Sequence, residues 1–211
     1  MGKKQRNIKI MVGSTVYGFE NDLTNIVAFL MRLGYDVLNS HVGTIKAYPN
    51  LSNLGSCLKA VEECDLFLGI IRPYYGSGNI GEQNITVEEI KRAIEMEKPH
   101  WFLVHHDVIV MRSFLKQFKM KDRTITGSGI VEKLKSTDCV ESFVIDKQHD
   151  YRCVDLYDMV LRDSIDVKER TGNWVHPFYY PNEYMTYINT QFSDKDFIQE
   201  ILKAKEASDG K

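Results

Sequence analysis

Apolar runs and amphipathic stretches alternate through the first half of the chain. Four short apolar runs predict strands, at residues 8–13, 35–40, 65–73 and 100–107. Three stretches with apolar side chains at helical spacing predict helices, at residues 19–35, 50–64 and 85–98. The third apolar run is almost unbroken, which is typical of a strand that is covered on both faces. This order predicts a parallel sheet with helices on both sides.

The second half of the chain has a weaker pattern. A helix is predicted over residues 110–119, a fifth strand over residues 142–146 and an amphipathic helix over residues 153–163. We therefore predict one α/β domain over residues 1–165, with a parallel sheet of about five strands.

Aromatic residues are concentrated in the remaining segment, residues 166–211. Within it, Tyr184, Tyr187, Ile188 and Gln191 recur at helical spacing, which suits packing against another surface. Aromatic enrichment is also common in the buried centre of protein interfaces. We predict a mostly helical C-terminal extension that packs on the domain or on a second subunit.

Composition excludes several classes of function. The 27 basic and 29 acidic side chains nearly cancel, and no long run of like charge indicates a nucleic-acid or membrane partner. The first residues lack an apolar signal core, and no segment is long and apolar enough to span a bilayer. We expect a soluble, cytoplasmic protein.

Cysteine and histidine spacing does not predict a metal site. The four cysteines are Cys57, Cys64, Cys139 and Cys153. They form no C-x-x-C pair, so buried thiols are expected. The adjacent His105 and His106 would point to opposite faces of a strand and could not easily share one ion. No metal is expected.

Ligands of an open parallel sheet bind beyond the carboxyl ends of its strands. After the first predicted strand, Ser14, Thr15 and Tyr17 offer hydroxyl groups beside glycine backbone. The loop after the third predicted strand begins with Tyr74, Tyr75, Gly76 and Ser77. Neither loop contains the glycine pattern of a dinucleotide fold or of a P-loop, so the glycines alone do not identify a ligand.

Two adjacent glutamates lie in the first turns of the helix predicted over residues 85–98. A rotation of about 100° per residue around an apolar stripe centred on Ile90 places Glu88 on the solvated side and Glu89 at the stripe's edge. Thr86 stands three residues before Glu89, as in a capping box. Glu89 is therefore either a capping residue or the acid of a site, and the roles can coexist.

Four motifs in this order resemble one known family. They are Gly13-Ser14-Thr15, Arg72-Pro73-Tyr74-Tyr75-Gly76, the segment from Thr86 to Ala93, and Lys98-Pro99. Over about residues 7–120 the chain resembles the TIR-like family catalogued as domain of unknown function 4062. The resemblance implies a flavodoxin-like α/β fold related to Toll/interleukin receptor (TIR) domains and to nucleoside 2-deoxyribosyltransferases.

The same resemblance implies an activity. Active members of both related groups use a glutamate near this helix to cleave an N-glycosidic bond, and Glu89 occupies that position. Hydroxyl groups of the first loop would orient a ribose or phosphate, and a tyrosine of the second loop would stack on a ring. The residues expected to bind substrate are Ser14, Thr15, Tyr17, Tyr74, Tyr75, Gly76, Ser77 and Thr86.

The expected function is cleavage of NAD or a related nucleotide in prokaryotic defence or stress signalling, as a glycohydrolase, a cyclase or a deoxyribosyltransferase-like enzyme. NAD is then a candidate substrate, and no cofactor is required. The alternative is a non-enzymatic module that self-associates, docks a signalling partner or senses a nucleotide. Ile85 replaces the aromatic residue found four positions before the glutamate in many active TIR enzymes, so the alternative stays open.

Overall fold

A parallel five-stranded sheet forms the centre of the computed structural model, which describes residues 6–76, 84–117, 149–150, 152–170 and 174–209. The strands are β1 (Lys9–Ser14), β2 (Asp36–Leu38), β3 (Leu66–Ile71), β4 (His100–His105) and β5 (Val175–Phe178). Their order is β2-β1-β3-β4-β5, and all four pairings are parallel. This is the flavodoxin-like order, so the predicted fold class is confirmed.

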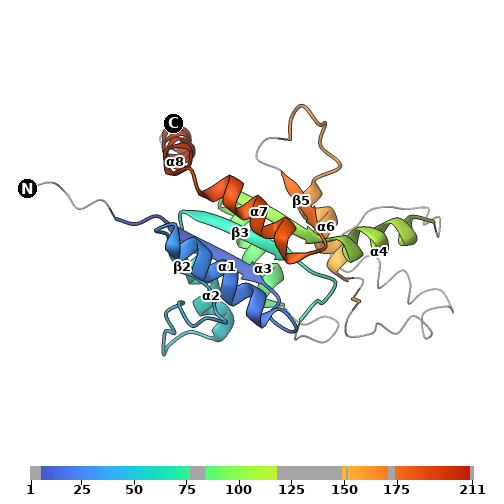
Figure 1. Cartoon of the computed structure of the whole chain (residues 1–211), viewed down its shortest axis with the longest axis horizontal. Coiled ribbons are helices and arrows are strands. Elements are labelled where there is room, and N and C mark those ends of the chain that lie inside the picture. The colour runs from blue at the N-terminus through green and yellow to red at the C-terminus, as the bar shows by residue number, and fades with distance from the viewer. Residues whose placement is uncertain (1–5, 77–83, 118–148, 151, 171–173, 210–211) are drawn as a thin grey trace, which may run out of the picture.

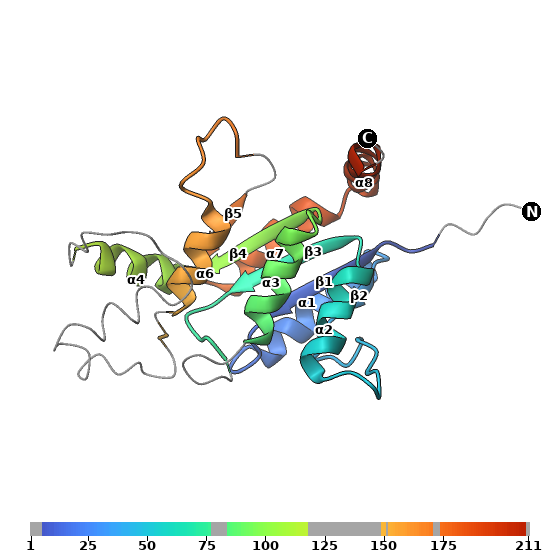
Figure 2. The ribbon, with the colours of Figure 1, turned by 180° about the vertical axis from the view of Figure 1, so that it is seen from behind.

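Helices cover both faces of the sheet (Figures 1 and 2). The described helices are α1 (Glu20–Arg32), α2 (Asn53–Glu63), α3 (Ile85–Glu95), α4 (His106–Gln117), α6 (Arg152–Leu161), α7 (Pro181–Phe192) and α8 (Lys195–Asp209). None of them combines the length and the apolar composition that a bilayer crossing requires.

Alternation along the strands separates the core into two clusters. In β3, Leu66, Leu68 and Ile70 pack with α1 and α7 in what we call the first-face cluster. Phe67 and Ile71 point the other way and pack with α2, α3, α4 and α6 in the second-face cluster. Because both faces are covered, β3 is buried along its whole length, as its apolar run predicts.

The fifth strand comes from the aromatic tail. Residues 142–146, where a strand was predicted, lie outside the described residues. In the described sheet β5 pairs with β4, with Val175 opposite Phe102. After β5, α7 returns over the first face, where Tyr184, Ile188 and Phe192 are buried with α1. The C-terminal extension therefore supplies part of the core, while a boundary near residue 165 and packing on a second subunit stay predictions.

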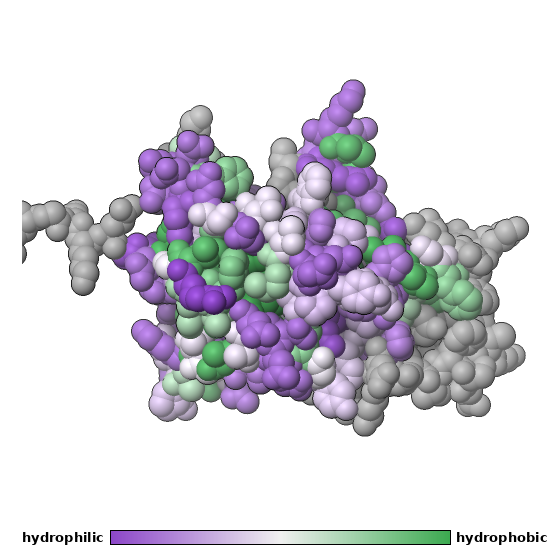
Figure 3. All heavy atoms as spheres, in the orientation of Figure 1, coloured by the Kyte–Doolittle hydropathy of each residue, from purple (hydrophilic) through white to green (hydrophobic). Residues whose placement is uncertain are grey.

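The last helix, α8, lies at the margin of the first face. Its Ile198 is fully buried, whereas Ile201 and Leu202 are only partly buried against the first-face cluster, and Phe197 is 43% exposed. Figure 3 shows apolar side chains reaching the surface on this side of the molecule. Self-association through the extension was one of the alternatives left open by the sequence, and it could use these partly exposed side chains.

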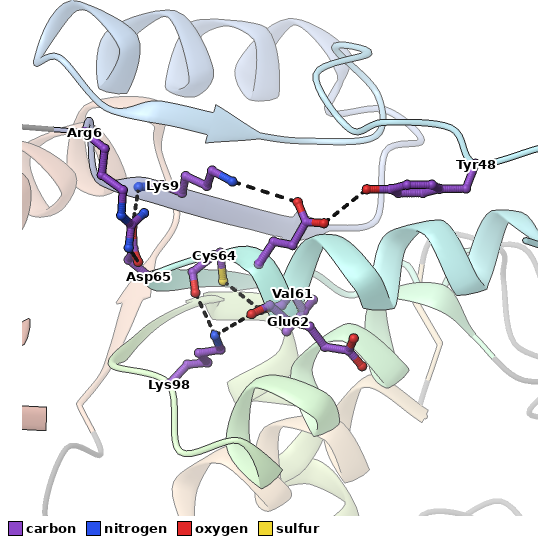
Figure 4. Close-up of polar contacts among 9 residues, drawn as sticks. Arg6, Lys9, Tyr48, Val61, Glu62, Cys64, Asp65 and Lys98 are labelled. Atoms are coloured by element: carbon purple, nitrogen blue, oxygen red, sulfur yellow. Dashed lines mark hydrogen bonds and ion pairs between the residues drawn. The ribbon is translucent and has the colours of Figure 1, made fainter. Parts of the chain in front are cut away.

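Charged side chains join the amino ends of the central strands (Figure 4). Asp65, which precedes β3, accepts two hydrogen bonds from the Arg6 guanidinium, at 2.7 and 2.9 Å, and one from the Lys9 amide at 2.8 Å. These bonds tie the start of β1 to the start of β3. The amino edge of the sheet is thus occupied by contacts that stabilise the fold.

Lys98 of the Lys98-Pro99 motif caps the end of α2. Its ammonium donates to the carbonyls of Glu62, at 2.8 Å, and Cys64, at 2.7 Å (Figure 4). A cation at a helix C-terminus also interacts favourably with the helix dipole. This half of the motif has a structural role.

Replacing Lys98 by Met is expected to lower the free energy of unfolding by about 1–3 kcal/mol, because two carbonyls lose a charged donor. The urea midpoint measures the effect. The matched control is Lys91→Met, which breaks a partly exposed ion pair with Glu88 and should cost less than about 0.5 kcal/mol. Equal losses in the two variants would contradict a capping role for Lys98.

Candidate functional site

The strand order reverses between β1 and β3, and the loops that follow these strands meet there. Ser14, the last residue of β1, lies opposite Ile70 of β3. A ligand of a doubly wound sheet binds at such a switch point. The site predicted from the two loops is therefore brought together at the carboxyl edge, opposite to the stabilising contacts of the amino edge.

The Glu89 carboxyl lies against the backbone of β1. A Cβ atom placed on Gly13 would stand 3.1 Å from Glu89 Oε2 and 2.9 Å from Phe67 Cζ. Gly13 therefore leaves the space that this carboxyl occupies. Glu89 is only 3% exposed and lies on the same buried side of α3 as Ile90 and Ala93. A carboxyl so deeply buried is rare unless it is paired or functional.

Burial sets the charge of this carboxyl. Removal from water raises the pKa of Glu89 to about 8, and a hydrogen bond from the Cys57 thiol acts in the opposite direction. None of the ion pairs among the described residues includes Glu89. At neutral pH the group is largely protonated, and a positive charge brought next to it would favour its ionised form.

The predicted capping box is wrong. The N-cap of α3 is Asn84, whose side-chain oxygen accepts from the Val87 amide at 3.2 Å and whose side-chain nitrogen donates to the Tyr75 carbonyl. Asn84 supplies both the cap and a tie to the loop after β3, so the helix begins before Thr86. Glu89 then lies beyond the first turn and does not cap it. A capping role no longer explains this acid.

The two neighbouring glutamates differ as helical geometry predicts. Glu88 is only partly buried, with its side chain 24% exposed, and forms an ion pair with Lys91 at 2.8 Å. Glu89 points to the interior. The pair thus offers a functional candidate and its matched control on the same turn of one helix.

The loop after β1 contains a buried hydroxyl without a partner. Ser14 donates to the Thr15 carbonyl at 3.1 Å, so its hydroxyl is turned toward its own backbone. Thr15 Oγ1 is buried and has no hydrogen-bond partner in the described part of the chain. A Cβ atom on Gly76 would stand 3.1 Å from Thr15 Cγ2, so this glycine, with φ +92°, lets the two loops approach. A buried hydroxyl left unpaired is a group that a ligand can satisfy.

The tyrosines of the two loops have different surroundings. Tyr17 stacks on Tyr74 with ring centroids 4.7 Å apart and stays 64% exposed. Tyr75 is partly buried, and the Arg152 guanidinium lies 3.9 Å from its ring centroid. Tyr17 is thus the tyrosine with the most open ring surface. Ser77 lies outside the described residues, and Thr86 is buried in the first turn of α3.

Two charged residues of this region were not among the predicted site residues, although Arg72 begins one of the four family motifs. Arg72 follows β3 and reaches the loop after β1. Asp155 of α6 is buried, and both of its carboxyl oxygens have no partner in the described part of the chain. Burial, with Asp158 and Asp150 nearby, raises the pKa of Asp155 to about 7. Asp155 could have been identified from the sequence as a charged residue within the amphipathic helix predicted over residues 153–163.

A hollow of about 370 Å³ lies elsewhere, along the edge strand β2. Its polar lining is largely paired, since Glu63 accepts from the Tyr48 hydroxyl at 3.1 Å and lies 3.9 Å from the Lys9 ammonium. It contains none of the predicted site residues. Within the described ranges, no three His, Cys, Asp or Glu side chains gather as metal ligands.

Comparisons with known proteins give one family and a distant structure. A family model described as domain of unknown function (DUF4062) matches residues 9–152. Among solved structures, the CMP N-glycosidase BcmB of Clostridium botulinum is 14% identical, with a TM-score of 0.39 over 87% of this chain and 98% of that chain. No curated protein matches the sequence. A relation to TIR domains stays a prediction.

Proposed function

This chain belongs to the family described as domain of unknown function (DUF4062), and from that premise we propose that it is an enzyme that cleaves the N-glycosidic bond of NAD or a related nucleotide. One observation carries the proposal. The Glu89 carboxyl is buried at the switch point beside Gly13, and among the described residues neither a paired cation nor a capping role accounts for it. Buried carboxyls with strongly displaced pKa values are typical of functional sites.

Glu89 suits the charge that develops in this reaction. When the bond between ribose C1′ and the base nitrogen breaks, its electron pair leaves with the base and positive charge develops on the ribose. A carboxylate close to C1′ stabilises that charge or traps it as a covalent intermediate. Water then bonds to C1′ and releases a proton; where the covalent intermediate has formed, the bond from C1′ to the carboxylate oxygen breaks in this step and the carboxylate is restored.

A cationic substrate fits the burial of this acid. The nicotinamide ring nitrogen of NAD already carries a positive charge, so nicotinamide leaves as a neutral molecule and needs no proton. The same charge would lower the pKa of a nearby Glu89 from about 8 and favour the carboxylate. A neutral nucleoside lacks this charge and would need its base protonated. We therefore rank NAD above neutral nucleosides.

The remaining site residues would bind and orient the nucleotide. The unpaired Thr15 hydroxyl would bond to a ribose or phosphate oxygen, and the exposed ring of Tyr17 would stack on a base. Tyr74 supports the Tyr17 ring from the other side. Ser14, Tyr75, Gly76, Ser77 and Thr86 keep the substrate-binding roles expected from the sequence as predictions.

Product analysis tests the proposal. The full chain is incubated separately with NAD, a deoxynucleoside and CMP, and released nicotinamide or base is separated by chromatography. We expect nicotinamide from NAD, with ADP-ribose, a cyclised product or a transferred sugar identifying hydrolysis, cyclisation or transfer. Binding of NAD without any release would instead support a nucleotide sensor. If the chain neither binds NAD nor releases nicotinamide or a base, that result would support the non-enzymatic interaction module.

A further inference from the structure

Arg72 connects the two loops of the switch-point site. It directly follows β3, yet its guanidinium donates three hydrogen bonds to the loop after β1. One nitrogen bonds to the carbonyl of Tyr17 at 2.8 Å and to that of Thr15 at 3.4 Å, and the other bonds to the carbonyl of Gly18 at 3.3 Å. Three backbone acceptors within four residues converge on one planar side chain.

The surroundings fix this side chain in place. The guanidinium carbon lies 4.6 Å from the centre of the Phe19 ring, so an aromatic face supports the hydrogen-bonded fork. No ion pair among the described residues includes Arg72. Gly18 adopts a left-handed φ of +68°, a conformation that glycine accommodates because it has no Cβ atom. The charge of Arg72 is therefore directed to backbone carbonyls.

We propose that Arg72 is a positioning residue, which holds the Thr15 hydroxyl and the Tyr17 ring in the geometry that receives the nucleotide. This inference rests on the proposed function for its role in turnover, but its structural part does not. Arg72 bonds to the carbonyls of both residues and makes no hydrogen bond with Glu89 in the described part of the chain. It would thus affect substrate binding more than the chemical step.

A planar guanidinium is required because the three carbonyls lie around one fork. Lysine has a single ammonium on a flexible stem and cannot reproduce two bonded nitrogens at fixed spacing. Glutamine removes the charge and leaves at most one donor group. We therefore expect the loop after β1 to be held most firmly with Arg72, less firmly in Arg72→Lys and least firmly in Arg72→Gln.

Amide hydrogen exchange tests the structural part. The reporters are the Phe19 amide, which donates to the Val16 carbonyl at 2.8 Å, and the Gly18 amide, which donates to the Glu20 carboxylate at 3.1 Å. In Arg72→Gln both should exchange about tenfold faster or more, and in Arg72→Lys by an intermediate factor. The control is Arg32→Gln, which removes an arginine above the Phe29 ring outside these loops. Unchanged exchange in the Arg72 variants would overturn the proposal.

Kinetics test the link to binding. With NAD as substrate, Arg72→Gln should raise KM about tenfold and change kcat less than about threefold. A fall in kcat at unchanged KM would overturn the positioning role. Should the wild type release no nicotinamide, the proposed function fails while the exchange result still decides whether Arg72 orders the loop. If Arg72→Gln does not fold, hydrogen exchange in Arg72→Lys decides whether Arg72 orders the loop after β1.

Discussion

Replacing Glu89 by Gln is expected to reduce nicotinamide release by about 10³-fold or more, because the amide cannot ionise and so cannot stabilise the positive charge that develops on the ribose. Gln has nearly the same shape as Glu, so the space above Gly13 stays filled. The amide oxygen can still accept the Cys57 thiol hydrogen. The variant therefore separates loss of the carboxyl's charge from loss of packing, and kcat for NAD measures it.

Glu88→Gln is the matched control for this substitution. The change is chemically identical and one residue away, but Glu88 is only partly buried and pairs with Lys91. Its kcat should stay within about twofold of the wild type. If Glu88→Gln lost as much activity as Glu89→Gln, or if Glu89→Gln kept wild-type turnover, Glu89 would not be the acid of the reaction.

The sequence predicts those parts of the fold in which side-chain periodicity follows from burial. The unbroken apolar run of β3 and the helical spacing of α1 both arise because one element contacts the core along its length. The prediction that Glu89 faces inward and Glu88 outward follows from the same geometry. Predicting these features requires only the position of a residue within its own helix or strand.

The position of the fifth strand could not be predicted from the local sequence pattern. β5 has only four residues, includes Pro177, and alternates too briefly to produce a strand pattern. Proline is compatible with a sheet edge, where one side of the strand has no neighbour, and β5 is the last strand of the described order. Its pairing with β4 joins residues more than 70 positions apart, and no local pattern reports such a contact.

Tertiary contacts also decided the site residues that the sequence missed. Asn84 is the cap of α3 partly because its amide bonds to the Tyr75 carbonyl, a contact across the loop after β3. Arg72 bonds to backbone carbonyls, which carry no sequence signature. Thr15 and Tyr17 were identified because they follow a strand at the carboxyl edge, but the sequence did not indicate what holds them there.

A pH-dependent gain in stability is the second large effect expected of Glu89→Gln. Burial raises the pKa of Glu89 from 4.5 to about 8. Between these values the folded protein keeps a proton that the unfolded chain has lost, so the wild type loses stability as pH rises. Gln has no proton to lose. At about 1.4 kcal/mol per pKa unit, the variant should exceed the wild type by roughly 3–5 kcal/mol at pH 8.5.

Urea unfolding at pH 4.5, 6.5 and 8.5 measures this difference. The advantage of Glu89→Gln should be smallest at pH 4.5, where the folded chain is protonated and about half of the unfolded chains still are, and should grow toward pH 8.5. Glu88→Gln, on the same turn but paired with Lys91, is measured in parallel as the control. A constant difference across this range would mean that the folded chain solvates or pairs the Glu89 carboxylate. That result would exclude the idea that the ionised Glu89 carboxylate lowers the free energy of unfolding.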